Sequence, residues 1–212
     1  MKKQMHKIVL LLVFILTIFA CSNNEDGDSI PPGIVSNVTV VSTNGGGIIN
    51  YSLPADDDIL YVKAIYTNSQ GEEVFKVASK YNTSLEVNGL NQSTPVNVKL
   101  YVIDLNENVS NVVEVDFTPL ESFIFLVQES IDITPDLGGV KITWENIASK
   151  TVFVYVNIID DEEETIRILS SNNSQESIFL RGLAANELTI STKVEDFEGN
   201  ITALIEMIME VA

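Results

Sequence analysis

The sequence is poor in the residues that carry most nucleophilic and metal chemistry. Its 212 residues include one histidine, one cysteine and one tryptophan. The histidine, His6, and the cysteine, Cys21, both lie close to the N-terminus. Beyond Cys21 the chain has no imidazole and no thiol, which excludes Ser-His and Cys-His nucleophilic pairs, the usual zinc sites and disulfides. We therefore expect a fold stabilised by its hydrophobic core, with no cofactor.

Positive charge is also scarce. Twelve Lys and Arg residues stand against 30 Asp and Glu, which gives a formal net charge of −18 at pH 7. Nucleic acids and anionic membrane surfaces carry the same sign and would be repelled. We therefore expect no nucleic-acid partner.

No hydrophobic run is long enough to cross a membrane permanently. The longest N-terminal run, residues 8–20, has 13 residues and follows Lys2, Lys3 and Lys7. A basic start followed by a short apolar stretch is typical of a secretory signal peptide, here residues 1–20. Its removal would take the net charge to −21, because three lysines and no acidic residue leave with it.

The end of this run, with Ala20 directly before Cys21, resembles the lipobox of bacterial lipoprotein precursors. The resemblance implies cleavage before Cys21, lipidation of Cys21 and a protein that is anchored to a membrane without spanning it. The alternative is an ordinary signal peptide with a cysteine near its end. Residues 21–32 are acidic, end in proline and contain few apolar side chains, so we expect a flexible linker. Their acidic residues resemble the export signal of Bacteroidota surface lipoproteins, which implies an outer-membrane protein that faces the cell exterior.

The rest of the chain contains two copies of one pattern. Gly46 and Gly89 lie 43 positions apart, as do Gly139 and Gly182. Three pairs of segments match in the same order: "GGGIINYSLP" (45–54) with "LGGVKITWEN" (137–146), "SLEVNGL" (84–90) with "SIFLRGL" (177–183), and "VIDLNENVSN" (102–111) with "VEDFEGNITA" (194–203). Matched segments at matched spacing predict two homologous domains, residues 33–119 and 120–212.

Both halves show the hydrophobic alternation of β-strands. Valines and leucines alternate with polar residues over 96–102, and a similar alternation runs through 152–158. Turn residues separate such runs, and no segment sustains a helical period. We therefore predict an all-β chain with two tandem antiparallel β-sandwiches. The short junction "TPLESF" (118–123) favours a rigid rod over two freely hinged domains.

Each half resembles a fibronectin type III or immunoglobulin-like module. The resemblance rests on one large aromatic in an early strand, Tyr51 in "INYSLP" and Trp144 in "ITWEN", and on a later "GL" corner. We expect Trp144 to lie in the core. The tyrosine that usually follows the corner and ties it down is replaced by Val96 in the first half and by Thr189 or a neighbour in the second.

More closely, the chain resembles a pair of domains of unknown function from Bacteroidota lipoproteins. The resemblance rests on "PPGIVSNV", "GGGIINYSLPADDDILYVKAIYT", "LYVIDLNENVSN" and "DLGGVKITWEN". It implies neighbours of the SusC/SusD type and a role in polysaccharide uptake. The function we predict is therefore that of a non-catalytic surface lipoprotein, an accessory glycan-binding or scaffold component. The alternative is a structural spacer or adhesion module that presents a separate binding domain.

Three groups of residues are candidates for a site. Asp56, Asp57 and Asp58 are consecutive carboxylates, and Asp104 opens "DLNEN", whose oxygen spacing imitates the start of a calcium loop. The simpler interpretation of Asp56, Asp57 and Asp58 is a solvated loop between two strands, because successive side chains point apart. The simpler interpretation of Asp104 is a turn, because "DLNEN" lacks the glycine and glutamate of calcium loops. The densest acidic run, "DDEEE" (160–164), predicts an exposed hairpin turn. No carboxylate pair is distinguished as a glycosidase site, so we expect no enzyme.

Glycan-binding modules usually present exposed aromatic rings. Tyr66, Tyr81 and Tyr101 are the candidates if they are exposed. Aromatic rings that converge on one face would favour glycan capture, whereas a uniformly acidic surface would favour a spacer.

Overall fold

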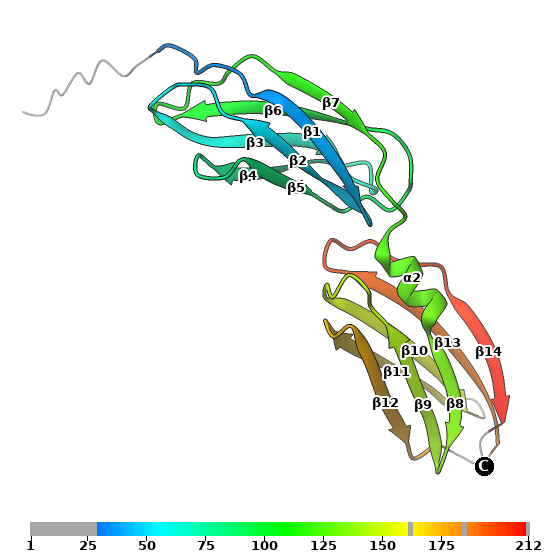
Figure 1. The fold of residues 1–212 in the computed structure, drawn as a ribbon. Coiled ribbons are helices and arrows are strands. Elements are labelled where there is room, and N and C mark those ends of the chain that lie inside the picture. The colour runs from blue at the N-terminus through cyan, green and yellow to red at the C-terminus, as the bar shows by residue number, and fades with distance from the viewer. Residues whose placement is uncertain (1–28, 161–162, 184–185, 211–212) are drawn as a thin grey trace, which may run out of the picture.

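The computed structural model describes residues 29–160, 163–183 and 186–210. The predicted signal peptide and Cys21 lie outside these residues, as do most of the predicted linker and residues 161–162 of the acidic run. The described part forms two β-sandwiches arranged end to end at an angle (Figure 1). No helix in it is both long enough and apolar enough to cross a membrane.

The first sandwich packs a three-stranded sheet against a four-stranded sheet. The smaller sheet has the order β1-β2-β5, with β1 at Ser36–Thr43, β2 at Gly46–Ser52 and β5 at Ser84–Val87. The larger sheet has the order β4-β3-β6-β7, with β3 at Ile59–Thr67, β4 at Glu73–Ser79, β6 at Val96–Asp104 and β7 at Val113–Phe117. All pairings are antiparallel.

The second sandwich repeats this arrangement strand for strand. Its smaller sheet has the order β12-β9-β8, with β8 at Asp132–Asp136, β9 at Gly139–Glu145 and β12 at Gln175–Arg181. Its larger sheet has the order β11-β10-β13-β14, with β10 at Val152–Asp160, β11 at Glu163–Ser171, β13 at Glu187–Asp196 and β14 at Ile205–Glu210. The predicted tandem of fibronectin type III-like sandwiches is therefore confirmed.

The two cores are built from equivalent residues. Tyr51 of β2 and Trp144 of β9 are both buried, which confirms the prediction for Trp144. A glycine occurs at the same position in both domains, Gly46 and Gly139, because the strands pack closely there. A Cβ at Gly46 would lie 2.1 Å from the carbonyl oxygen of Val87. The same holds at Gly139, where a Cβ would lie 1.9 Å from the carbonyl oxygen of Leu180. A side chain at either position would separate the two strands.

One helix, α2 at Phe123–Ser130, departs from the all-β prediction. It buries Phe123, Ile124 and Val127 against β9 and β13, one strand from each sheet of the second sandwich. Its eight residues span only about two turns, too short to show a helical period, and the segment "FIFLV" is rich in side chains that strands also favour. The helix forms because its apolar face packs against β9 and β13, which are inner strands of the two sheets.

The junction between the sandwiches is held by hydrogen bonds on both sides of the linker. The linker residue Leu120 pairs with the β1–β2 turn, where it accepts a bond from Gly45 N at 3.1 Å and donates one to Thr43 O at 3.0 Å. Further along the interface, Gln70 Nε2 donates to Asn200 Oδ1 at 3.0 Å across the two domains. Lys150 Nζ lies 2.7 Å from Glu86 Oε1, which also joins the domains.

Candidate functional site

The outer side of the first four-stranded sheet carries aromatic and apolar side chains. Alternation along β3 turns Val62, Ala64 and Tyr66 inward, so the residues between them point to solvent. We define the aromatic face by six outward residues of β3, β4 and β6: Tyr61, Lys63, Ile65, Phe75, Val77 and Tyr101. Phe75 is 60% exposed and Val77 is 55% exposed, so the β4 side of this face presents apolar side chains to solvent.

The strand register brings these side chains into contact. Lys63 lies between Tyr101 of β6 and Val77 of β4, its direct partners on the two neighbouring strands. Its Nζ lies 4.6 Å from the centre of the Phe75 ring, a cation–π distance. Tyr61 and Tyr101 border a groove of about 370 Å³ that continues to Glu107 and Val109. The face therefore combines flat apolar rings with hydrogen-bonding groups.

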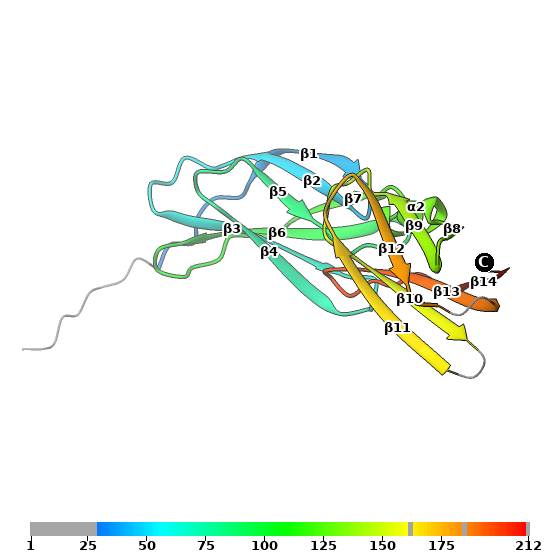
Figure 2. The ribbon, with the colours of Figure 1, turned by 90° about the horizontal axis from the view of Figure 1, so that it is seen from below.

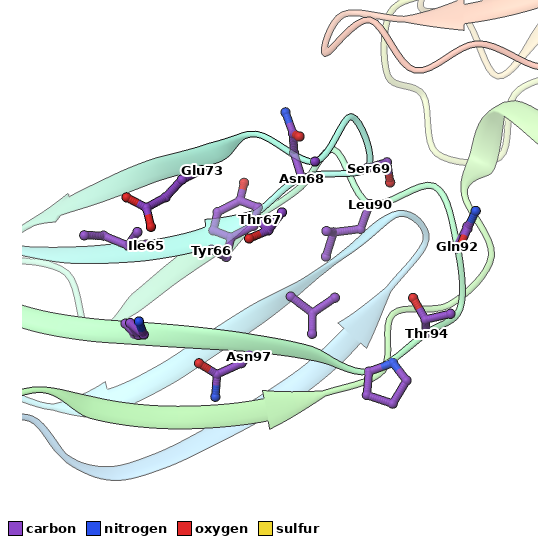
Figure 3. A pocket seen from close by; sticks show the side chains of 14 residues that line it. Ile65, Tyr66, Thr67, Asn68, Ser69, Glu73, Leu90, Gln92, Thr94 and Asn97 are labelled. Atoms are coloured by element: carbon purple, nitrogen blue, oxygen red, sulfur yellow. The ribbon is translucent and has the colours of Figure 1, made fainter.

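A polar cleft of about 430 Å³ adjoins this face and shares Ile65 with it (Figure 3). It forms because the pairing of β3 with β6 ends at Ile65 and Lys99, after which the two strands separate. Tyr66 and Leu90 are buried beneath it. Hydroxyl, amide and charged side chains surround it, namely Thr67, Asn68, Glu73, Gln92, Thr94, Asn97 and Lys99. Such groups can donate and accept hydrogen bonds.

The expectation that Tyr66 is an exposed ligand contact is wrong. Tyr66 is only 3% exposed, because it shares the inward phase of Val62 and Ala64. Its hydroxyl donates to Asn88 O at 2.8 Å and accepts from Asn88 N at 3.2 Å. Burial raises the pKa of Tyr66. The hydrogen bond with the Asn88 backbone lowers this pKa, and the charges of Glu198 and Glu86 raise it further. Tyr66 therefore holds the corner before Gly89 in place. In related folds a tyrosine after the corner does this, and here Val96 replaces that tyrosine.

The other two candidate tyrosines lie in different surroundings. Tyr101 belongs to the aromatic face and is partly buried there. Tyr81 lies in the connection between β4 and β5 and is 86% exposed. Its ring has Lys80 Nζ at 5.8 Å, and it lines neither the groove nor the cleft. Of the three tyrosines, Tyr101 belongs to the aromatic face, Tyr66 lies buried beneath the cleft and Tyr81 lies at neither.

The consecutive aspartates do not converge. Asp56 accepts a hydrogen bond from Gly33 N at 2.8 Å, and Asp56 and Asp57 are exposed in the loop between β2 and β3. Asp104 is buried, and its carboxylate accepts bonds from Asn106 N, Asn108 N and Asn108 Nδ2. Within the described residues, no group of three or more acidic, histidine or cysteine side chains is placed to hold a metal ion.

Asp104 instead organises a turn that occurs twice. Burial opposes its ionisation, but the three hydrogen bonds from Asn108 and Asn106 lower the pKa of Asp104 below its usual value. In the second sandwich Asp196 accepts the equivalent bonds from Glu198 N, Asn200 N and Asn200 Nδ2. The repeated segments "DLNEN" and "DFEGN" are therefore matching turns after β6 and β13.

The residues that sequence reasoning missed are Tyr61, Lys63 and Phe75. The sequence did contain a signal for Tyr61 and Lys63. The charge of Lys63 indicates which side of β3 faces solvent, and Tyr61, two residues earlier, lies on the same side. Phe75 could not be added without the pairing of β3 with β4, because its own strand alternates too weakly to fix a phase. Convergence of these side chains depends on strand register, which the sequence does not state.

Two family models match the chain, each over less than half of its length. Residues 32–119 match a domain of unknown function, DUF4959. Residues 120–209 match a second domain of unknown function, DUF5126. A comparison with proteins of curated function finds no match.

Solved structures give distant likenesses. A SusE-like protein is 17% identical over 42% of this chain with a TM-score of 0.38, and the match spans 31% of that protein's chain. A two-domain fibronectin type III segment of chicken tenascin is 11% identical, with 84% of this chain and 99% of that chain covered and a TM-score of 0.39. The chicken interferon gamma receptor alpha chain is 12% identical, with 84% and 98% covered and a TM-score of 0.35. At these scores the likenesses say nothing about function.

Proposed function

We propose that this chain is a non-catalytic binding module that captures a neutral glycan on the aromatic face of its first domain. The observation that carries the proposal is the convergence of Tyr61, Tyr101 and Phe75 with Lys63 on one side of the four-stranded sheet. Sugar rings have apolar C–H faces and hydroxyl edges, so they fit rings that are bordered by amine, amide and carboxylate groups. The formal charge of −18 favours a neutral glycan, because an anionic one would be repelled.

The adjoining cleft supplies the polar half of the proposed site. Thr67, Asn97 and Lys99 lie where the sheet opens beyond Ile65. A glycan that stacks on Tyr101 can extend along the sheet toward them, since the face and the cleft share Ile65. We expect the rings to provide most of the affinity and the cleft to select among sugars.

The location of the protein is part of the proposal. The N-terminal pattern that ends at Cys21 supports a lipid anchor, and the acidic residues after it support export to the outer surface of the outer membrane. A glycan-capturing lipoprotein in this position would supply a SusC/SusD-type uptake system. Mass spectrometry of the membrane-extracted protein tests the anchor, with an acylated N-terminal Cys21 as the expected result.

A binding panel tests the function. The protein from Ser22 onward, purified without its acyl group, would be applied to immobilised amylopectin, xyloglucan, galactomannan and arabinoxylan, with and without calcium. We expect binding to at least one of them, unaffected by calcium, and about tenfold weaker binding after Tyr101→Ala, equivalent to ~1.4 kcal/mol. Tyr81→Ala is the matched control, since Tyr81 is more exposed but lies outside the site. Equal losses in both variants would contradict the proposal.

A spacer or adhesion role is the second candidate, and the junction favours it. Hydrogen bonds between the linker and the β1–β2 turn, together with the Gln70–Asn200 bond, hold the two sandwiches in one arrangement. A rigid tandem of this kind can present another domain at a fixed distance from a membrane. Absence of binding across the whole panel would favour this role.

A further inference from the structure

The second sandwich carries a face built like the aromatic face of the first. In the first domain Val62 pairs with Val102, and in the second Val154 pairs with Val194. One position further along each strand, the pair Lys63 and Tyr101 corresponds to Tyr155 and Lys193. The lysine and the tyrosine have exchanged strands, but the cross-strand pair is retained.

The neighbours of this pair also correspond. We define the second face by Phe153, Tyr155, Asn157, Ile166, Ile168 and Lys193. Phe153 takes the place of Tyr61, and Ile166 takes the place of Phe75. Both isoleucines are 58% exposed, so the apolar edge seen at Phe75 and Val77 is repeated.

Contacts hold the tyrosine ring of the second face in position. Lys193 Nζ lies 4.8 Å from the centre of the Tyr155 ring, as Lys63 lies beside Phe75 in the first domain. The Tyr155 hydroxyl donates to Glu195 Oε2 at 2.5 Å. A ring fixed at both its face and its hydroxyl loses little conformational freedom when a ligand stacks beside it.

The two faces lie on the same side of the molecule. In Figure 2 the four-stranded sheet of each domain lies below the three-stranded sheet. Both outer faces therefore point away from the three-stranded sheets in a common direction. The hydrogen-bonded junction maintains this arrangement.

From this placement we infer that the second face is a second glycan site, and that one extended neutral polysaccharide occupies both faces at once. This inference rests on the proposed function of the first domain. Its ligand is a long chain and not a short oligosaccharide, because only a polymer reaches from one domain to the other. The second contact is then made within an existing complex, which raises the overall affinity without any new kind of contact.

The test compares chain lengths in four proteins: the wild type, Tyr101→Ala, Tyr155→Ala and the double variant. Calorimetry would use the panel polysaccharide that binds most tightly and a short oligosaccharide prepared from it. For the polysaccharide we expect at least tenfold weaker binding in either single variant. For the oligosaccharide we expect two sites in the wild type and one in each single variant.

Two controls distinguish the loss of the Tyr155 ring from unfolding of the second domain. Tyr155→Phe keeps the ring and should retain polysaccharide binding, and thermal unfolding of each variant shows whether the second domain remains folded. If Tyr101→Ala weakens binding while Tyr155→Ala does not, the inference is overturned and the proposed function stands. If neither variant changes binding, or no polysaccharide binds, both are overturned. Capture of a protein partner by the second face, abolished by Tyr155→Ala with glycan binding intact, would also overturn the inference.

Discussion

At the scale of single residues, two buried tyrosines of the first sandwich differ in one respect. The Tyr66 hydroxyl makes two hydrogen bonds to Asn88, whereas the Tyr51 hydroxyl has no hydrogen-bond partner within the described residues. Burial without a partner raises the pKa of Tyr51 to about 12. An unpaired buried hydroxyl costs stability, while a paired one contributes to it.

This contrast predicts opposite results for the same chemical change. Tyr66→Phe should lower the free energy of unfolding by about 1 to 2 kcal/mol, because it releases the corner before Gly89 and leaves Asn88 unpaired. Tyr51→Phe should leave it unchanged or raise it by up to about 1 kcal/mol. Urea denaturation of the two variants measures both. Equal destabilisation would show that the Tyr66 bonds do not hold the corner.

The lowered pKa of Asp104 predicts how stability depends on pH. A carboxyl group whose pKa is lower in the folded state contributes stability above its unfolded pKa of about 3.9, and this contribution is lost as the pH falls through the folded value. Asp104→Asn should therefore lower the melting temperature at pH 7, because an amide turns a donor toward Asn108 Nδ2. The difference from wild type should shrink below about pH 4.

Thermal unfolding from pH 7 to pH 3 would show this, with Asp57→Asn as the control in an exposed loop. A constant difference between Asp104→Asn and wild type over that range would rule out the ionised carboxylate as the source. Comparison with wild type at each pH removes the effect of the protein's overall negative charge, which changes in both proteins together.

Part of the candidate site could be predicted from the residue types in the sequence. Tyr101 could be proposed from the sequence, and the inward position of Tyr66 could have been found from the phase of Val62 and Ala64. The meeting of Tyr61 and Lys63 of β3 with Phe75 of β4 could not be predicted, because it depends on the register between the two strands, which is a property of the folded sheet.

At the scale of elements, helix α2 stabilises the second sandwich through a buried amide. Gln128 Nε2 donates to Thr192 Oγ1 at 2.9 Å, and Gln128 Oε1 accepts from Thr202 Oγ1 at 2.9 Å. The helix is thereby attached to β13 and to the segment before β14. Alternation in the sequence predicted the strands. It did not predict α2, because the helical state of this segment depends on the surface that it covers.

Gln128→Ala should lower the free energy of unfolding of the second domain by about 2 to 3 kcal/mol, because two buried threonine hydroxyls each lose a hydrogen bond. Glu129→Ala, one residue along the same helix and exposed, should change it by less than about 0.5 kcal/mol. Denaturation monitored by Trp144 fluorescence reports on this domain. A similar loss in both variants would show that the hydrogen bonds of the Gln128 amide do not stabilise this domain.

At the scale of the whole molecule, the internal repeat predicted two sandwiches, and their strand orders agree with that prediction. The sequence did not show that both four-stranded sheets lie on one side, because the junction sets that relation through bonds between residues far apart in the chain. Gln70 and Asn200 are 130 positions apart.

Loss of these contacts should loosen the tandem. Spin labels at Ser79→Cys and Ser170→Cys, with Cys21→Ser, would give one narrow distance distribution in the wild type. The distribution should broaden when Gln70→Ala is combined with Lys150→Ala, which removes the bonds to Asn200 and Glu86. Lys80→Ala, a cation away from the junction, should leave it narrow. A broad distribution in the wild type would contradict a rigid tandem.

The most direct test of the central claim, that a neutral glycan binds the aromatic face of the first domain, is to locate the bound sugar by nuclear magnetic resonance. Backbone amide shifts would be recorded while an oligosaccharide of the best-binding panel polysaccharide is added. We predict that, in the first domain, shifts concentrate at Tyr61, Lys63 and Tyr101 and extend toward Asn97 in the cleft. Shifts confined to the three-stranded sheets, or no shifts at saturating sugar, would contradict the account.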